Sequence, residues 1–134
     1  MPARLVDSYW LSPMILATSN PLKQVLVVHY LGKVRPAELK QSREDLKSLL
    51  AGMRPGFRMI ANLSYLESMG LDCRLELGRN MDLFSQAGVG RVVRVIPDPS
   101  KDMGLNILAF FHYPNRPEIV NCTDLAQAVE KLLA

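Results

Sequence analysis

The chain has 134 residues, of which 49% are hydrophobic, so its length suits one globular domain that buries roughly two thirds of its unfolded surface. Its formal charge of +3 comes from 16 basic and 13 acidic residues that are interspersed along the chain, which is typical of a solvated surface and argues against a nucleic-acid binder. We therefore expect a single domain over residues 1–134, in which residues 1–13 are an N-terminal extension or an edge element.

Cysteine usage and hydropathy indicate a cytoplasmic protein. Cys73 and Cys122 lie far apart and lack the spacing of a zinc site or a redox dithiol, so we interpret them as buried thiols in a reducing compartment. The apolar stretch 10–17 contains Pro13 and is too short to span a bilayer. No export signal is evident, and we expect no membrane span.

The first predicted elements are two strands, at residues 14–18 and 24–34. Residues 19–21 between them are Ser, Asn and Pro, which are strong turn formers, so we expect a hairpin. The second run is almost continuously apolar over residues 25–28, as in a strand that is covered on both faces.

A helix is predicted from Pro36, because proline suits the first helical turn. The helix ends at Gly52 and the Arg-Pro-Gly sequence 54–56, and the apolar run 57–63 then predicts a central strand. The apolar residues that repeat at helical spacing are Leu39, Leu46, Leu49, Leu50 and Met53.

A second helix is predicted from Leu71, after a loop over residues 64–70. Gly78 interrupts this helix, and we interpret it as a weak position of the helix or, alternatively, as a position of close packing. Residues 87–90 end the helix, and the β-branched run 91–96 predicts another strand. The apolar stripe of this helix consists of Cys73, Leu77, Met81 and Phe84.

The C-terminal third is less regular. Residues 102–113 are apolar on all sides, which suits a buried helix or a strand, and we favour a helix because Asp102 suits an N-cap and Pro114 a stop. Residues 118–121 predict a short strand, and Thr123 can cap a last helix. In that helix one face is expected to be shared by Leu125, Val129, Leu132 and Leu133.

Strands that alternate with helices predict an α/β fold with right-handed crossovers. We expect a mostly parallel sheet of four or five strands, an antiparallel edge hairpin and about four helices.

This element order, together with residues 57–71, resembles the STAS family, the SpoIIAA-like domains of anti-sigma-factor antagonists and sulfate-transporter tails. Members carry a strand that runs into Asp-Leu-Ser and then into Asp-Ser-Ser-Gly-Leu or Asp-Ser-Thr-Gly-Leu. The matching residues here are 62–64 and 67–71, although Asn62, Glu67 and Met69 depart from that pattern. The resemblance extends loosely over residues 22–133 and implies a SpoIIAA-like fold.

The resemblance also implies a site. The serine that family members phosphorylate corresponds to Ser68, and a phosphate there would be favoured near the N-terminus of the next helix. The alternative is that Ser68 is an ordinary N-cap or loop hydroxyl. The neighbouring candidates for contact with a partner are Ser64, Glu67, Met69, Gly70 and Asp72.

Other residues give weaker indications. Glu67 and Asp72 could form an acid–base pair, but we interpret them as solvated loop charges. We interpret Asp98 and Asp102 as turn and cap residues, and His29 as a hydrogen-bonded imidazole within a strand. His112 lacks a companion nucleophile motif.

Two further features of the sequence do not indicate a nucleotide or nucleic-acid site. The Gly-Val-Gly-Arg sequence 88–91 lacks the context of a dinucleotide site. The basic residues Arg91, Arg94, Lys101 and Arg116 have no interleaved aromatic residues, so we expect no nucleic-acid binding.

The sequence therefore favours a regulatory or protein-interaction domain without enzymatic activity, cofactor or metal. Its expected partner is a protein, of the anti-sigma-factor or kinase type if the resemblance holds. The alternative is a carrier or sensor of a small apolar, lipid-like ligand, suggested by Met53, Met59, Met69, Met81 and Met103. An exposed edge strand, or the apolar residues 9–11, also makes a homodimer plausible.

Overall fold

The computed structural model describes residues 14–96 and 111–133. Within these residues the elements are β1 (Ile15–Asn20), β2 (Val25–Tyr30), β3 (Gly32–Val34), α1 (Pro36–Leu50), β4 (Arg58–Asn62), β5 (Leu66–Met69), the 3-10 helix η1 (Leu71–Cys73), α2 (Arg74–Gln86), β6 (Arg91–Val95), β7 (Glu118–Cys122) and α4 (Leu125–Leu133).

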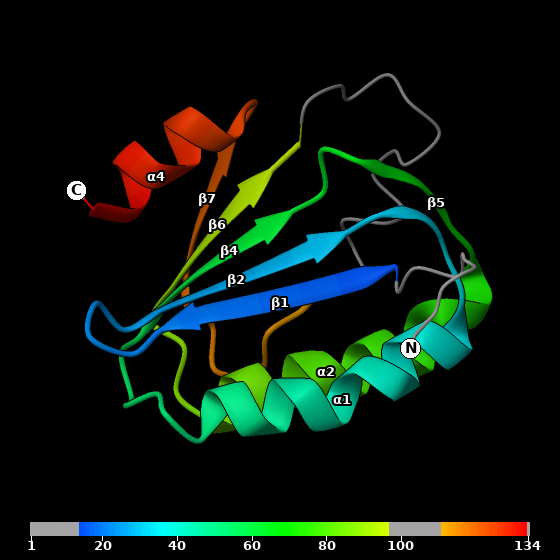
Figure 1. Cartoon of the computed structure of the whole chain (residues 1–134), viewed down its shortest axis with the longest axis horizontal. Helices are drawn as coiled ribbons and strands as arrows, with labels where there is room; N and C mark the ends of the chain where they lie inside the picture. Colours follow the sequence, from blue (N-terminus) through cyan, green and yellow to red (C-terminus); the bar gives the residue numbers. More distant parts are fainter. Residues whose placement is uncertain (1–13, 97–110, 134) are drawn as a thin grey trace, which may run out of the picture.

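The main sheet has five strands in the order β1-β2-β4-β6-β7. β1 pairs antiparallel with β2, and the other neighbours are parallel. Figure 1 shows α1 and α2 along one face of this sheet and α4 on the opposite face. The predicted α/β fold, with a mostly parallel sheet and an antiparallel edge hairpin, is confirmed.

The predicted single strand over residues 24–34 is wrong. β2 ends at Tyr30, and Gly32 adopts a φ of 61°, a left-handed conformation that glycine tolerates far better than other residues. The chain therefore leaves the main sheet, and β3 pairs in parallel with β5 in a separate two-stranded sheet. This small sheet carries the segment that follows β4.

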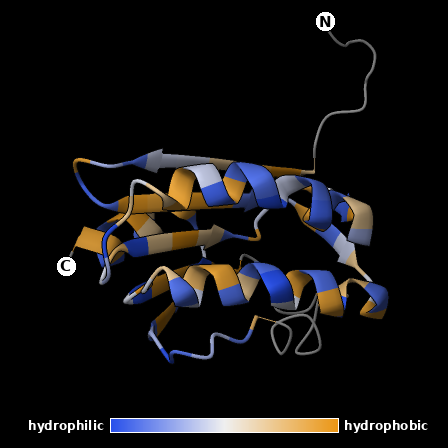
Figure 2. Cartoon of the chain, turned by 90° about the horizontal axis from the view of Figure 1, so that it is seen from below, coloured by the Kyte–Doolittle hydropathy of each residue, from blue (hydrophilic) through white to orange (hydrophobic). Residues whose placement is uncertain are grey.

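The larger core lies between the sheet and the helix pair α1 and α2. The predicted helical stripes are confirmed, because Leu39, Leu46 and Leu50 of α1 are buried, and so is the stripe of Cys73, Leu77, Met81 and Phe84. Figure 2 shows both helices with hydrophilic and hydrophobic residues alternating along their length, as amphipathic helices require. A smaller apolar cluster lies under α4 on the opposite face.

A polar clamp joins α1 to α2. Arg43 donates from Nε to Asn80 Oδ1 at 2.9 Å and pairs with Glu76 Oε1 at 2.6 Å. Asn80 is only 1% exposed and donates to the Leu39 carbonyl, which satisfies its buried amide. The hydrogen bond from Arg43 lowers the pKa of Glu76, so the clamp stays ionised at neutral pH.

The predicted apolar face of the last helix is confirmed at Leu132, which is buried, and is wrong for its other three residues. Leu125, Val129 and Leu133 are 41%, 46% and 61% exposed, whereas Ala128 and Leu132 are buried. α4 is the one described helix on its side of the sheet, so only a narrow stripe of it is covered. The side chain that caps the N-terminus of α4 is that of Asp124 and not, as predicted, that of Thr123. Asp124 Oδ1 accepts a hydrogen bond from the Gln127 amide at 2.8 Å.

The predicted helix 102–113 falls mostly outside the described residues. Residues 111–113 are described and form no helix. Phe111 instead packs edge-on against Tyr30, with ring centroids 5.3 Å apart. Tyr113 is buried, and this burial raises the pKa of its hydroxyl. These aromatic rings close the core near the end of β2.

Candidate functional site

The candidate site is the segment that leaves the C-terminal end of β4, which we name the 64–72 surface. The chain turns at Ser64 and Tyr65, where the Leu66 amide donates to the Leu63 carbonyl at 3.2 Å. The predicted loop over residues 64–70 is wrong for residues 66–69, because these form β5 and pair with β3. Residues at both ends of β5 are buried and the two between them are exposed.

Ser68 lies in β5 with an exposed side chain. It does not cap a helix, because Gly70 is the N-cap of η1 and Cys73 is the N-cap of α2. In the register between the two strands Ser68 lies opposite Lys33, which is also exposed. Adjacent strands lie about 4.8 Å apart, so the fold sets a basic side chain beside this hydroxyl.

The other predicted contact residues divide into exposed and buried ones. Glu67, Gly70 and Asp72 are exposed, and Ser64 is half-buried. Met69 is not available for contact, because it is 5% exposed and packs in the main core. It therefore supports the 64–72 surface from beneath.

Three exposed apolar side chains lie close to Ser68 in the chain, and the sequence pattern did not indicate them as candidate contact residues. Tyr65, Leu71 and Leu75 are 68%, 71% and 65% exposed. They come from the turn before β5, from η1 and from the first turn of α2. Apolar and aromatic side chains of this kind are enriched in the buried centres of protein interfaces.

A buried polar network holds the start of the segment. Asn62 is 1% exposed, and its Oδ1 accepts from the Ser64 amide at 3.0 Å and from Ser64 Oγ at 2.5 Å. Its Nδ2 lies 2.8 Å from His29 Nδ1. Because Asn62 Oδ1 is used as an acceptor, Nδ2 is the donor, so His29 carries its proton on Nε2. The interpretation of His29 as a hydrogen-bonded imidazole is confirmed.

Gly70 lies at the start of η1 in an extended backbone conformation, next to the Asp72 side chain. A Cβ at this position would lie 2.7 Å from Asp72 Oδ1, so the Asp72 carboxylate folds back over the glycine. The Cys73 thiol then donates to the Val34 carbonyl at 3.3 Å and ties η1 to the end of β3. Burial, reinforced by the Asp72 charge, raises the pKa of this thiol.

The remaining sequence candidates do not converge on one site. Asp98, Lys101, Asp102 and Met103 lie outside the described residues. Arg91 and Arg94 are three positions apart on β6 and therefore face opposite sides of the sheet. Within residues 14–96 and 111–133, no group of three or more His, Cys, Asp or Glu side chains could hold a metal ion.

Of the methionines that suggested a ligand site, the four that the structure describes are core residues. Met59, Met69 and Met81 are buried, and Met53 packs partly buried against the same core. In the described part of the chain, no helix is both long and apolar enough to cross a bilayer.

Comparison with solved structures identifies the fold. An uncharacterised protein of the DUF3478 family from Shewanella loihica, described as having a SpoIIAA-like fold, superposes with a TM-score of 0.61 at 18% identity, over 88% of this chain and 91% of that one. The unphosphorylated anti-sigma factor antagonist SpoIIAA gives a TM-score of 0.57 at 16% identity, over 90% and 98%. The phosphorylated Bacillus SpoIIAA gives 0.53 at 16% identity, over 88% and 98%.

At these identities the likeness concerns the fold, and the chain has the α/β SpoIIAA-like fold that the sequence predicted. No protein-family model and no curated protein sequence matches the chain.

Proposed function

We propose that this chain is a single STAS-like domain that works by binding a protein partner through the 64–72 surface, and that phosphorylation of Ser68 controls this binding. The observation that carries the proposal is the exposure of Ser68 on a short paired strand, with exposed Tyr65 and Leu71 on either side of it in the chain. An exposed hydroxyl close in the chain to exposed apolar side chains is a suitable place for a modification that controls association.

The negative charge of a phosphate on Ser68 explains how phosphorylation would control partner binding. A phosphate adds a charge of about −1.5 to −2 at neutral pH, and desolvating that charge in an apolar interface is unfavourable. Lys33 lies opposite Ser68 and would pair with the phosphate within the domain. The modified domain is therefore expected to remain folded while it loses affinity for its partner.

The support beneath the surface favours binding over local disorder. Met69 and Leu66 anchor β5 in the core, and the Asn62 network fixes the turn that precedes it. A surface held in this way presents its exposed side chains in one geometry, which lowers the entropic cost of association.

The solved structures of similar fold support a regulatory role that phosphorylation controls. One of the proteins that this chain resembles is described as an anti-sigma factor antagonist, and it is known in unphosphorylated and phosphorylated forms. For this chain we infer a cytoplasmic regulatory role without catalysis, with an anti-sigma-factor-like or kinase-like protein as the partner.

The test compares variants of the tagged full chain in co-purification from the native host. Ser68→Asp and Leu71→Glu should lose a protein that the unmodified chain and Ser68→Ala both capture. Gln41→Glu is the matched control, because it adds the same charge at an exposed position of α1. All these variants are expected to change the free energy of unfolding by less than about 0.5 kcal/mol, as is usual for exposed positions.

Two results would contradict the proposal. One is an identical set of captured proteins for Ser68→Asp, Leu71→Glu and the control. The other is an equal loss for all three variants, since that would indicate a response to charge anywhere on the surface.

A further inference from the structure

The strand β1 forms one edge of the main sheet, and its outer side has no partner strand among the described residues. The Leu31 amide donates to the Met14 carbonyl at 2.7 Å, which makes these two residues a hydrogen-bonded pair of the hairpin. Because such pairs alternate along an antiparallel ladder, the backbone groups of Ile15, Ala17 and Ser19 point away from β2. The edge therefore offers three N–H groups and three carbonyls in the spacing of a strand.

This edge lacks the usual protection against pairing. Natural edge strands carry charged residues, prolines or bulges that prevent the addition of another strand. β1 has the sequence Ile-Leu-Ala-Thr-Ser-Asn, with no charge and no proline, and its register with β2 is regular. The opposite edge strand, β7, begins with a charged residue, Glu118.

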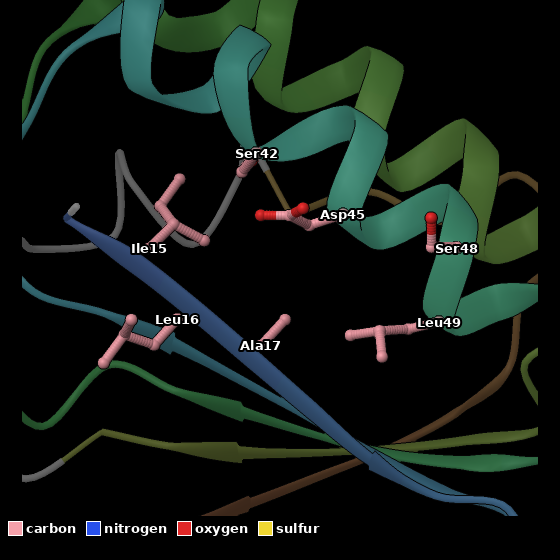
Figure 3. Close-up of a pocket in the computed structure, with 7 residues that line it drawn as sticks. All are labelled: Ile15, Leu16, Ala17, Ser42, Asp45, Ser48 and Leu49. Carbon is pink, nitrogen blue, oxygen red and sulfur yellow. The ribbon is translucent and has the colours of Figure 1, made fainter. Parts of the chain in front are cut away.

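A pocket of about 300 Å³ lies beside this edge, between β1 and α1. Figure 3 shows Ile15 and Ala17 of β1 across from Asp45 and Leu49 of α1. An added strand would place alternate side chains over Ile15 and Ala17, on the side of the sheet that α1 covers. Those side chains would enter the pocket, whose complete lining is Ile15, Leu16, Ala17, Ser42, Asp45, Ser48 and Leu49.

Asp45 defines the charge of the expected occupant. It is the one charged residue in the pocket lining, it is exposed, and it has no ion pair or hydrogen bond among the described residues. Ser42 Oγ is already occupied, since it donates to the Leu39 carbonyl at 2.8 Å. A cationic side chain would therefore complement the rim, and an apolar one would complement Leu49 and Ile15.

We propose that the β1 edge binds an extended segment of a protein partner as an additional strand, with an apolar side chain in the pocket and a lysine or arginine two positions away paired with Asp45. This surface is separate from the 64–72 surface and does not depend on the proposed role of Ser68. Main-chain hydrogen bonds would supply affinity, and the pocket and Asp45 would supply specificity.

The same features disfavour a second copy of the chain as the occupant. Pairing β1 with β1 of another copy would add no cation, because β1 contains no basic residue. Antiparallel pairing about a two-fold axis would also bring both α1 helices, each with an unpaired Asp45, to the same face of the joined sheet.

The test uses nuclear magnetic resonance of the full chain with a blocked peptide, Thr-Val-Thr-Lys-Thr-Val-Thr, as the probe. Binding should slow amide exchange at Ile15, Ala17 and Ser19, whose N–H groups point outward. Leu16 and Thr18 already pair with β2 and should change little. The matched probe with glutamate in place of lysine should bind more weakly.

Two variants test which groups of the pocket and of the β1 edge contact the peptide. Asp45→Asn should weaken binding of the lysine peptide by about two- to fivefold, as for an exposed ion pair, and should leave the glutamate peptide unweakened. Ala17→Pro removes one outward N–H without touching the β1–β2 ladder, and should weaken both peptides by about tenfold. Unfolding curves of both variants would verify that they fold.

Three outcomes would overturn the proposal. The first is no change at these amides with millimolar peptide. The second is protection of the three amides without peptide at every protein concentration, which would mean that residues 1–13 of the chain cover the edge. The third is protection that grows with protein concentration together with a dimer in analytical ultracentrifugation, which would make a second copy the occupant.

Discussion

At the scale of single residues, Asn62 controls how the chain leaves the main sheet. It is the buried junction between His29 on β2 and Ser64 in the following turn. Both polar atoms of its side chain have a partner at the point where the 64–72 surface begins. The position of this turn thus depends on one amide side chain.

Replacing this amide should therefore destabilise the protein. Asn62→Ala leaves the partly buried Ser64 amide and hydroxyl and His29 Nδ1 without their partner and removes a buried side chain, which costs about 1–3 kcal/mol. Asn121→Ala is the control, because Asn121 is exposed and accepts from Arg94 at the edge of the sheet; it should cost less than about 0.5 kcal/mol. Urea denaturation at neutral pH measures both. Equal losses for the two variants would contradict this role of Asn62.

The sequence indicated some residues of the proposed site and could not indicate others. Ser68 was predictable as exposed, because it follows an apolar strand and precedes a glycine. Lys33 was not, because its position beside Ser68 depends on a register between strands that are far apart in the chain. Asn62 was recognised only as a departure from a family motif, since its partner His29 lies on a different strand.

At the scale of elements, two glycines have opposite roles. Gly78 lies within α2, and a Cβ added there would meet no atom within 4 Å, so the predicted weak position of the helix is confirmed and the alternative of close packing is wrong. Gly88 follows α2 with a φ of 91°, and a Cβ there would lie 2.8 Å from Pro55 Cα. One glycine is a weakness of the helix and the other is required by the turn that ends it.

Alanine substitutions should separate these roles. Gly78→Ala should stabilise the protein by about 0.5–1 kcal/mol, because alanine restricts the unfolded chain and favours the helix. Gly88→Ala should destabilise it by more than about 1 kcal/mol, because the backbone conformation and the contact with Pro55 both oppose a side chain. Thermal unfolding followed by circular dichroism shows whether each variant is more or less stable than the unmodified protein. A change in melting temperature in the same direction for both variants would contradict the roles given to the two glycines.

Periodicity predicted the buried faces of α1 and α2 and failed for α4. The two long helices pack against each other and against the sheet, so their whole apolar stripe is covered. In α4 the hydrophobic residues extend beyond the covered stripe, and a pattern cannot show which part of a wide apolar face the sheet will cover. The break of the strand at Gly32 was missed because its neighbours are as β-prone as those of a continuous strand.

At the scale of the whole molecule, the two cysteines lie in separate cores and can be used to follow the unfolding of each. Cys73 is fully buried in the core under α1 and α2, and Cys122 is 6% exposed in the core under α4. Burial raises the pKa of both thiols, so little thiolate forms at neutral pH. Both should resist alkylation in the native protein.

Denaturant should expose the two thiols together if the chain is one cooperative domain. We expect iodoacetamide to label Cys73 and Cys122 at the same urea concentration, read by peptide mass spectrometry after a short pulse. The five-stranded sheet is shared by both cores, which is the physical reason for a common transition. Labelling of Cys122 well before Cys73 would instead indicate that α4 and β7 unfold independently.

The departure of the chain at Gly32 has a consequence for how a signal at Ser68 would act. It places that serine in a ribbon of two short strands that is not part of the five-stranded ladder. Side-chain packing attaches this ribbon to the main core, because Val34, Leu66 and Met69 are buried there. A charge added at Ser68 would therefore change the surface of this ribbon without altering the backbone hydrogen bonds of the five-stranded sheet.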